Sequence, residues 1–268
     1  MNRLAKIPFV KISATGNDFI LFDNREKMFT GAEGDFFRKI CQRRSWVGAD
    51  GVLLIENSQD FDFQMRYFNS DGRESEMCGN GARGAAYFAL QQGIVPGPKM
   101  SFTVSSNRYE ATVQENRVRL KMPPPRDIRK NLGIVEESFL REGGFVNTGV
   151  PHFVLFTDDL ESLEILTPAQ KYRYHPIFQP KGTNVDFVQV VDRSRINVRT
   201  YERGVEGETL ACGTGCVAAA VVASLRKLTG LPVEVVTRGG VLKVYGDSAE
   251  ASLFLEGEVR IVYEGRLL

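Results

Sequence analysis

The chain has 268 residues, 43% of them hydrophobic, and its 34 basic and 33 acidic residues leave a formal net charge of +1. With this balance the chain has no net positive charge large enough to attract nucleic acid or an anionic membrane. We therefore expect a small neutral or zwitterionic ligand as partner. No apolar run approaches the roughly 20 residues of a membrane span, and the start MNRLAKIPFVKI lacks a signal-peptide core, which indicates a cytoplasmic protein.

The predicted elements of the first half are β-rich runs followed by one apolar helix. In chain order these are FILFD (19–23), GVLLIE (51–56), FQMRYF (63–68) and a helix over 82–92. The second half shows FVLFTD (153–158), DFVQVV (186–191), INVRTYE (196–202) and a helix over 216–228. Further strand-like runs follow, which we expect to be separated by glycine turns: VEVVTRG, VLKVYG, AEASLFLEG and VRIVYEG.

The two halves resemble each other at one fixed spacing. YFNSDGRESEMCGNG (67–81) aligns without a gap on YERGVEGETLACGTG (201–215), which is a shift of 212 − 78 = 134 residues. The same shift places FILF on FVLF and GAD on GTN. Three segments in register indicate a duplicated chain.

We therefore predict an α+β fold of two homologous, pseudo-twofold-related domains. Each is expected to be a strongly curved, largely antiparallel β-sheet around a central buried helix, because both helices are apolar on nearly all faces. The boundary is placed in KMPPPRD (121–127), since consecutive prolines end regular structure. This divides the chain into 1–122 and 123–268, with the last strand near 256–268 able to return to the first half.

Four cysteines, at positions 41, 78, 212 and 216, are too few for a disulfide scaffold in a chain of this length. The chain has only two histidines, so a four-ligand zinc site is not expected, and no metal is predicted. Cys41 and Cys216 are interpreted as buried residues. Cys78 and Cys212 differ from them, because they occupy matching places in the two halves.

Each cysteine of this pair stands before Gly-X-Gly at a helix start, where free backbone N–H groups favour a thiolate and a ligand carboxylate. The thiol pKa is expected to fall below its usual value of about 8.5. In two domains that face each other across a cleft, two such thiols would flank one α-carbon. One thiolate removes the α-proton and the opposite thiol returns one, which is a geometry for racemisation or epimerisation.

Several motifs carry a resemblance to a known family: ATGNDFILFD, FNSDGRESEMCGNGAR, GVPH, GTNVDF and YERGVEGETLACGTG. In this order they resemble the diaminopimelate epimerases, which interconvert LL- and meso-diaminopimelate without a cofactor in lysine and peptidoglycan synthesis. The resemblance extends from Phe9 to the last strands. It implies an isomerase with an amino-acid substrate, and a homodimer is possible.

The resemblance also implies roles for individual residues. Cys78 and Cys212 match the two catalytic cysteines, and Glu202 and His152 match polar groups beside the reacting centre, which receive the amino group or assist thiol ionisation. The arginine fork of Arg203 suits a distal carboxylate. The remaining matches to substrate contacts are Asn17, Asn69, Gly79, Asn80, Asn184, Gly213 and Thr214.

The chain departs from the family pattern at three positions. Val150 stands where the family has asparagine, Gly51 where some members have glutamine, and Gly84 where many have a further cysteine. The loss of the asparagine keeps open racemisation of another amino acid, such as histidine, although Arg203 without a distal carboxylate would be unpaired. Two other classes remain open: a two-lobed amino-acid-binding protein without chemistry, and a redox protein that uses the two thiols as a reversible disulfide.

Overall fold

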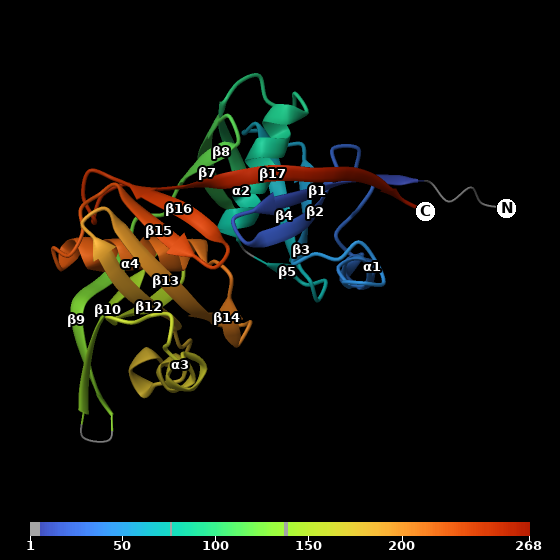
Figure 1. Ribbon diagram of the computed structural model, residues 1–268. Helices are drawn as coiled ribbons and strands as arrows, with labels where there is room; N and C mark the ends of the chain where they lie inside the picture. Colours follow the sequence, from blue (N-terminus) through green and yellow to red (C-terminus); the bar gives the residue numbers. More distant parts are fainter. Residues whose placement is uncertain (1–5, 76, 137–138) are drawn as a thin grey trace. The chain divides into compact units, whose positions relative to one another are not determined.

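The computed structural model describes residues 6–75, 77–136 and 139–268. It divides into two compact units, the first formed by residues 1–120 and 257–268 and the second by residues 121–256. Each unit is a twisted β-sheet with one long helix packed on it (Figure 1). No helix in the described part of the chain is long and apolar enough to cross a membrane.

The first unit is a mainly antiparallel sheet in which two pairs of strands run parallel, β2 with β3 and β4 with β6. The helix α2 follows the short strand β5 and packs on β1, β2, β3 and β7. The elements are β1 (Ile7–Ala14), β2 (Asn17–Asp23), α1 (Gly34–Ile40), β3 (Gly51–Glu56), β4 (Phe63–Asn69), β5 (Glu74–Ser75), α2 (Gly79–Gln91), β6 (Lys99–Val104), β7 (Asn107–Gln114) and β8 (Arg117–Lys121).

The second unit repeats this order, with β11 parallel to β12 and β13 parallel to β15. The helix α4 packs on β10 to β13 and on β15 and β16. The elements are β9 (Arg126–Glu136), β10 (Phe139–Asn147), β11 (Pro151–Phe156), α3 (Leu166–Arg173), η1 (Pro176–Phe178), β12 (Asn184–Asp192), β13 (Arg195–Glu202), β14 (Gly207–Thr209), α4 (Gly213–Leu225), β15 (Val233–Thr237) and β16 (Gly240–Tyr245).

The repeat is visible in the strand register as well as in the order of elements. Phe19 pairs with Gly51 in the first unit, and Phe153 pairs with Val185 in the second, so both partners are displaced by 134 residues. The helices α2 and α4 begin 213 − 79 = 134 residues apart and have 13 residues each. The predicted duplication of an α+β unit is therefore confirmed.

Both long helices are buried, as their composition predicts. Ala82, Ala85, Ala86 and Ala89 of α2 are inaccessible to solvent, as is every residue of α4 from Cys216 to Ala223. Small side chains let the strands approach the helix closely on several faces. The helices begin at Gly79 and Gly213 rather than at 82 and 216, because the glycines join the first turn and the preceding cysteines are the N-cap residues.

The end of the chain differs from the sequence prediction. AEASLFLEG and VRIVYEG were expected as two strands separated by a turn, but Phe254–Leu267 is one strand, β17, with Gly257 inside it. From Val259 to Leu267 this strand pairs antiparallel with β1 in the first unit. A glycine within a strand marks a turn only when the backbone hydrogen bonds are interrupted there, and sequence alone does not show whether they are.

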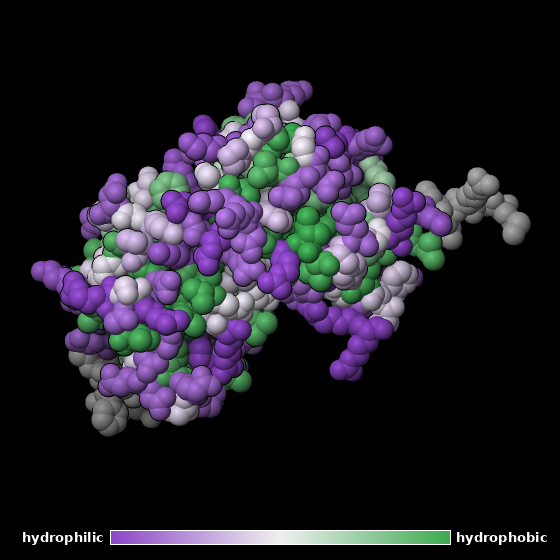
Figure 2. All heavy atoms as spheres, turned by 45° about the horizontal axis from the view of Figure 1, so that its top comes forward, coloured by the Kyte–Doolittle hydropathy of each residue, from purple (hydrophilic) through white to green (hydrophobic). Residues whose placement is uncertain are grey.

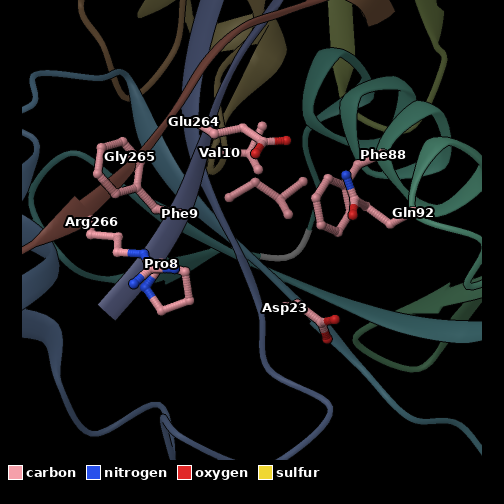
Figure 3. A pocket seen from close by; sticks show the side chains of 10 residues that line it. Pro8, Phe9, Val10, Asp23, Phe88, Gln92, Glu264, Gly265 and Arg266 are labelled. Carbon is pink, nitrogen blue, oxygen red and sulfur yellow. The ribbon is translucent and has the colours of Figure 1, made fainter. Parts of the chain in front are cut away.

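Charged and polar side chains cover most of the face seen in Figure 2, with hydrophobic side chains scattered between them. A cavity of about 390 Å³ lies in the first unit between β1, β2, β17 and the last turns of α2 (Figure 3). Phe88 and Gln92 form its helical side, at the end of α2 opposite Cys78. This cavity therefore lies apart from the residues that the sequence singles out.

Candidate functional site

Cys78 and Cys212 hold the same position in their units, directly before the first turn of α2 and of α4. Both are N-cap residues with extended backbone, at φ −136° and ψ 113° for Cys78 and φ −111° and ψ 112° for Cys212. The Cys78 Sγ accepts a hydrogen bond from the Gly81 amide at 3.4 Å. The sulfur of Cys212 lies 3.4 Å from the Thr214 hydroxyl. Cys212 is buried, with 7% of the residue exposed.

Around Cys78, the two asparagines of the predicted site hold each other in place. The Asn80 amide donates to the Asn17 Oδ1 at 2.7 Å, and the Asn17 amide donates to the Asp50 Oδ2 at 2.9 Å. Arg83, one turn along α2, donates to the Asn80 Oδ1 at 2.8 Å. Both amide groups are therefore fixed in orientation beside the start of the helix that Cys78 caps.

Charged groups extend this network away from the helix. Arg43 bridges Asp18 and Asp50, and the buried Lys11 forms an ion pair with Asp18 at 2.7 Å. Burial alone would raise the pKa of Asp18, but the hydrogen bonds from Arg43 and Lys11 outweigh it and lower the pKa to about 2. Asp18 thus remains ionised near neutral pH, and Arg43 links it to Asp50, which accepts the hydrogen bond from Asn17.

In the second unit, His152 is the centre of a buried cluster on β11, β12 and the start of α4. Its Nδ1 lies 2.7 Å from the Asp186 Oδ2, and its Nε2 lies 2.9 Å from the Thr214 hydroxyl and 3.3 Å from the Asn184 amide. His152 and Asp186 are wholly inaccessible to solvent. The carboxylate orients the imidazole, which in turn orients the Thr214 hydroxyl beside Cys212.

Asp186 belongs to this cluster, and it was not among the residues predicted from the sequence. It lies in β12 between Val185 and Phe187, accepts a hydrogen bond from Thr200 at 2.7 Å, and corresponds to Val52 in the first unit by the shift of 134. An acidic residue in an otherwise apolar run was the available signal. Gly215 allows its close approach, because a Cβ on this glycine would lie 2.4 Å from the Asp186 Oδ1.

The electrostatics of Cys212 contradict the expected low pKa. Burial raises the pKa of this thiol well above its ordinary value, and the nearby carboxylates of Glu202 and Asp186 raise it further. The hydrogen bonds from Thr214 and from the Gly215 amide act in the opposite direction but are outweighed. Burial and the two carboxylates therefore favour the thiol of Cys212 over its thiolate, although the amide at the helix start acts in the opposite direction.

Glu202 ends β13 beside this cluster, and Arg203 follows it in the turn. Desolvation raises the pKa of the Glu202 carboxyl, as does the charge of Asp186. The backbone amide of Arg203 donates to the Asn184 Oδ1 at 2.7 Å, and its guanidinium donates to the Lys181 carbonyl at 3.2 Å. Asn184 thus joins the end of β13 to His152.

The structure groups the predicted residues within each unit. Asn17, Asn80 and Gly79 lie with Cys78, while Asn69 ends β4, where its backbone closes a turn with Arg73. A second group gathers at the start of α4 in the second unit: Cys212, Gly213, Thr214, His152, Asn184, Glu202 and Arg203. No group of three or more His, Cys, Asp or Glu side chains with metal-site geometry occurs in the described ranges.

The departures from the family pattern have different structural consequences. A Cβ at Gly84 would lie 2.9 Å from the Ile12 Cγ2, so a cysteine here would require the Ile12 side chain to shift. A Cβ at Gly51 would lie 2.5 Å from the Phe68 carbonyl oxygen. Val150 lies in the turn before β11, where its carbonyl accepts a hydrogen bond from the Thr148 amide.

Known proteins resemble this chain over nearly its full length. The model of the family described as diaminopimelate epimerase matches residues 9–127 and again 144–262. The chain is 44% identical to the diaminopimelate epimerase of Aquifex aeolicus, over 97% of each chain. It is 41% identical to that of Archaeoglobus fulgidus, over 98% of this chain and 96% of the relative.

Solved structures of low identity share the fold. A protein of the phenazine biosynthesis PhzF family from Bacillus anthracis aligns over 99% of this chain and 100% of its own, with a TM-score of 0.74 and 15% identity. A hydroxyproline epimerase from Agrobacterium vitis, solved with bound trans-4-hydroxy-L-proline, aligns over 100% and 94%, with a TM-score of 0.67 and 14% identity.

The duplicated sheet-and-helix unit, with a cysteine capping the long helix of each half, defines a two-cysteine protein of this shared α+β fold. The family model matches both halves of the chain, and the relatives align with it over nearly their full length. The chain belongs to the diaminopimelate epimerase family.

Proposed function

We propose that the protein is an isomerase that converts LL-2,6-diaminopimelate to the meso isomer, without a cofactor, in lysine and peptidoglycan synthesis. The observation that carries this proposal is the 44% identity to a diaminopimelate epimerase over 97% of both chains. The two equivalent N-cap cysteines support it, because one thiolate can act as the base on one face of a carbon while the other thiol acts as the acid on the opposite face.

The difficult step is removal of a weakly acidic α-proton without a cofactor to receive the charge. Stabilisation must come from dipoles that are already oriented where the charge develops. The helix starts at Gly79-Asn80 and Gly213-Thr214 present backbone N–H groups of this kind, and we assign them to the substrate α-carboxylate.

Cys212 begins the reaction as the acid in this scheme, because its raised pKa keeps it protonated near neutral pH. Cys78 then removes the proton from the opposite face of the α-carbon. In the reverse direction Cys212 must become the base, and a substrate ammonium group beside Glu202 would cancel the negative charge that now disfavours its thiolate.

We assign His152 a positioning role rather than a catalytic one. The imidazole is fully buried, and both of its nitrogens have hydrogen-bonding partners, Asp186 on one side and Thr214 with Asn184 on the other. It acts through Thr214, whose hydroxyl lies next to the Cys212 sulfur. Substrate specificity is assigned to Arg203, which suits the distal carboxylate, and Val150 removes one polar contact of about 1 kcal/mol.

The test is exchange of the substrate α-hydrogen for solvent deuterium, followed by mass spectrometry. LL-diaminopimelate, histidine and lysine are incubated separately with the protein in deuterium oxide. Exchange with diaminopimelate is expected to be the fastest by far. Faster exchange with histidine would replace the proposed substrate, and no exchange with any of the three would overturn the assignment as an enzyme of this class.

A further inference from the structure

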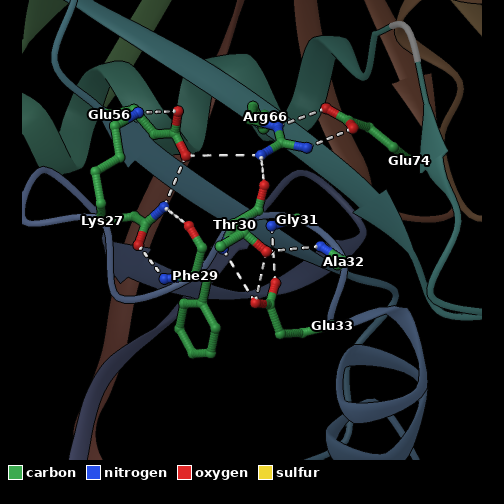
Figure 4. A network of polar contacts seen from close by, with 10 residues as sticks. Lys27, Phe29, Thr30, Gly31, Ala32, Glu33, Glu56, Arg66 and Glu74 are labelled. Carbon is green, nitrogen blue, oxygen red and sulfur yellow. Dashed lines mark hydrogen bonds and ion pairs between the residues drawn. The ribbon is translucent and has the colours of Figure 1, made fainter.

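In the first unit, Arg66 ties the segment before Cys78 to the rest of the sheet. Its guanidinium binds Glu74 with two parallel hydrogen bonds, Nε to Oε1 at 2.8 Å and Nη2 to Oε2 at 2.6 Å. Its third nitrogen donates to the Thr30 carbonyl at 2.8 Å, in the loop before α1 (Figure 4). Gly31 makes this approach possible, because a Cβ there would overlap the guanidinium.

In the second unit, Arg199 does the same for the segment before Cys212. Its Nε and Nη2 bind Glu208 at 2.8 and 2.9 Å, and its Nη1 donates to the carbonyls of Leu160 and Leu163 at 2.9 and 2.8 Å. Those two carbonyls belong to the loop before α3. This pair is well buried, with 10% and 15% of the two side chains exposed.

The two arrangements have the same offset in the strand ladder, although the arginines are 199 − 66 = 133 residues apart and the glutamates 208 − 74 = 134. Phe68 faces Glu74 between β4 and β5, and Tyr201 faces Glu208 between β13 and β14. In each unit the arginine stands two residues before the residue that faces the glutamate. Each glutamate stands four residues before its cysteine, since 78 − 74 and 212 − 208 are both 4.

We propose that the Arg66–Glu74 and Arg199–Glu208 pairs are positioning clamps, each of which holds one of the two thiols at the reacting carbon. The inference rests on the proposed function. A planar guanidinium that binds a carboxylate with two bonds fixes direction as well as distance, which a single-point contact does not. The third nitrogen of each guanidinium also donates to a carbonyl in the loop before α1 or before α3. Each cysteine segment is thus linked to two parts of its own unit.

Loss of one clamp is expected to affect the two diastereomers differently, which a general loss of stability would not do. Each clamp serves one thiol, and each thiol faces one side of the α-carbon. Loosening the Cys212 segment should leave Cys78 able to remove and return a proton on its own face. The α-hydrogen of one diastereomer would then still exchange with solvent while its inversion is lost, and loosening the Cys78 segment should affect the other diastereomer.

The experiment measures deuterium exchange and inversion separately, starting from LL- and from meso-diaminopimelate. The variants are Arg199→Met and Arg66→Met. Glu208→Gln and Glu74→Gln are milder changes, which are used instead if an arginine variant does not fold. Arg25→Met is the matched control, because Arg25 forms a similar two-bond pair with Asp23 on no cysteine-bearing segment.

A misplacement of about 1 Å lowers a rate by roughly 100-fold, so inversion is expected to fall about 10- to 100-fold in the clamp variants. The ratio of exchange to inversion should rise for one diastereomer in the Arg199 and Glu208 variants and for the opposite one in the Arg66 and Glu74 variants. Equal loss of exchange and inversion from both diastereomers, or a loss no larger than in Arg25→Met, would overturn the clamps alone. Absence of exchange in the parent protein would instead overturn the proposed function, and the clamps with it.

Discussion

Replacement of Gly215 by alanine tests the packing around the His152 cluster most sharply. The added Cβ would lie 2.4 Å from the Asp186 Oδ1 and 3.1 Å from the Thr200 Oγ1. Ordinary contacts begin near 3.4 Å, so a displacement of roughly 1 Å is required. Asp186 has little freedom to give way, because both of its oxygens make hydrogen bonds of 2.7 Å, to His152 and to Thr200.

Two effects of opposite sign set the magnitude. Overpacking of a well-filled site costs about 1–3 kcal/mol, and strain on a buried hydrogen bond adds about 1 kcal/mol. Alanine in place of a helical glycine recovers up to about 1 kcal/mol. The free energy of unfolding is therefore expected to fall by about 1–3 kcal/mol, with a melting temperature lower by roughly 3–10 °C.

Thermal melts followed by circular dichroism check this value, with Gly79→Ala as the control. Gly79 begins the equivalent helix of the first unit, and a Cβ there would meet no atom within 4 Å. Its melting temperature should stay unchanged or rise slightly. If Gly215→Ala were as stable and as active as the parent, the proposed role of the Asp186–His152 contact at the start of α4 would be refuted.

Three further predictions concern ionisable groups. Cys78→Ala and Cys212→Ala should each abolish inversion while the circular dichroism spectrum stays native; normal turnover in either variant would remove the two-thiol mechanism. Because the pKa of Glu202 is raised above the unfolded value of about 4.3, its charge destabilises the fold above that range, and the cost disappears as the pH falls. Glu202→Gln should then be more stable than the parent in denaturant at pH 8 and no more stable at pH 4, although inactive, and the reverse order would contradict this. Burial raises the pKa of Cys41 to about 12, so Cys41→Ala should leave the number of thiols labelled at pH 8 unchanged, and a loss of one label would show this thiol to be reactive.

Much of the fold was predictable because the chain is duplicated, so the same pattern of strands and helix occurs twice in the sequence. The repeat at 134 residues identified the matching strands, and the two Cys-Gly-X-Gly segments located both helix starts. Helix α4 carries apolar side chains on all faces, which predicted its burial. Gly257 was misjudged because a glycine inside a strand and a glycine in a turn have the same local sequence signal.

The environment of Cys212 was not predictable from its helix-start motif. Its pKa depends on burial and on Glu202 and Asp186, which come from two other strands. The repeat itself is uninformative here, because the shift of 134 places Glu202 on Phe68 and Asp186 on Val52. The second half thus has acidic residues at two positions where the first half has the apolar residues Phe68 and Val52, although the Cys-Gly-X-Gly motifs match.

The central claim is that two thiols on opposite faces invert one α-carbon. Its most direct measurement follows LL-diaminopimelate through a single turnover in deuterium oxide and determines the position and number of deuterium atoms in the product. The expected product is meso-diaminopimelate with one deuterium at the inverted carbon, because the opposite thiol, whose hydrogen has exchanged with the solvent, supplies the returning atom. Inversion with retention of the original α-hydrogen would contradict it, since that outcome requires one group to carry the same proton across both faces.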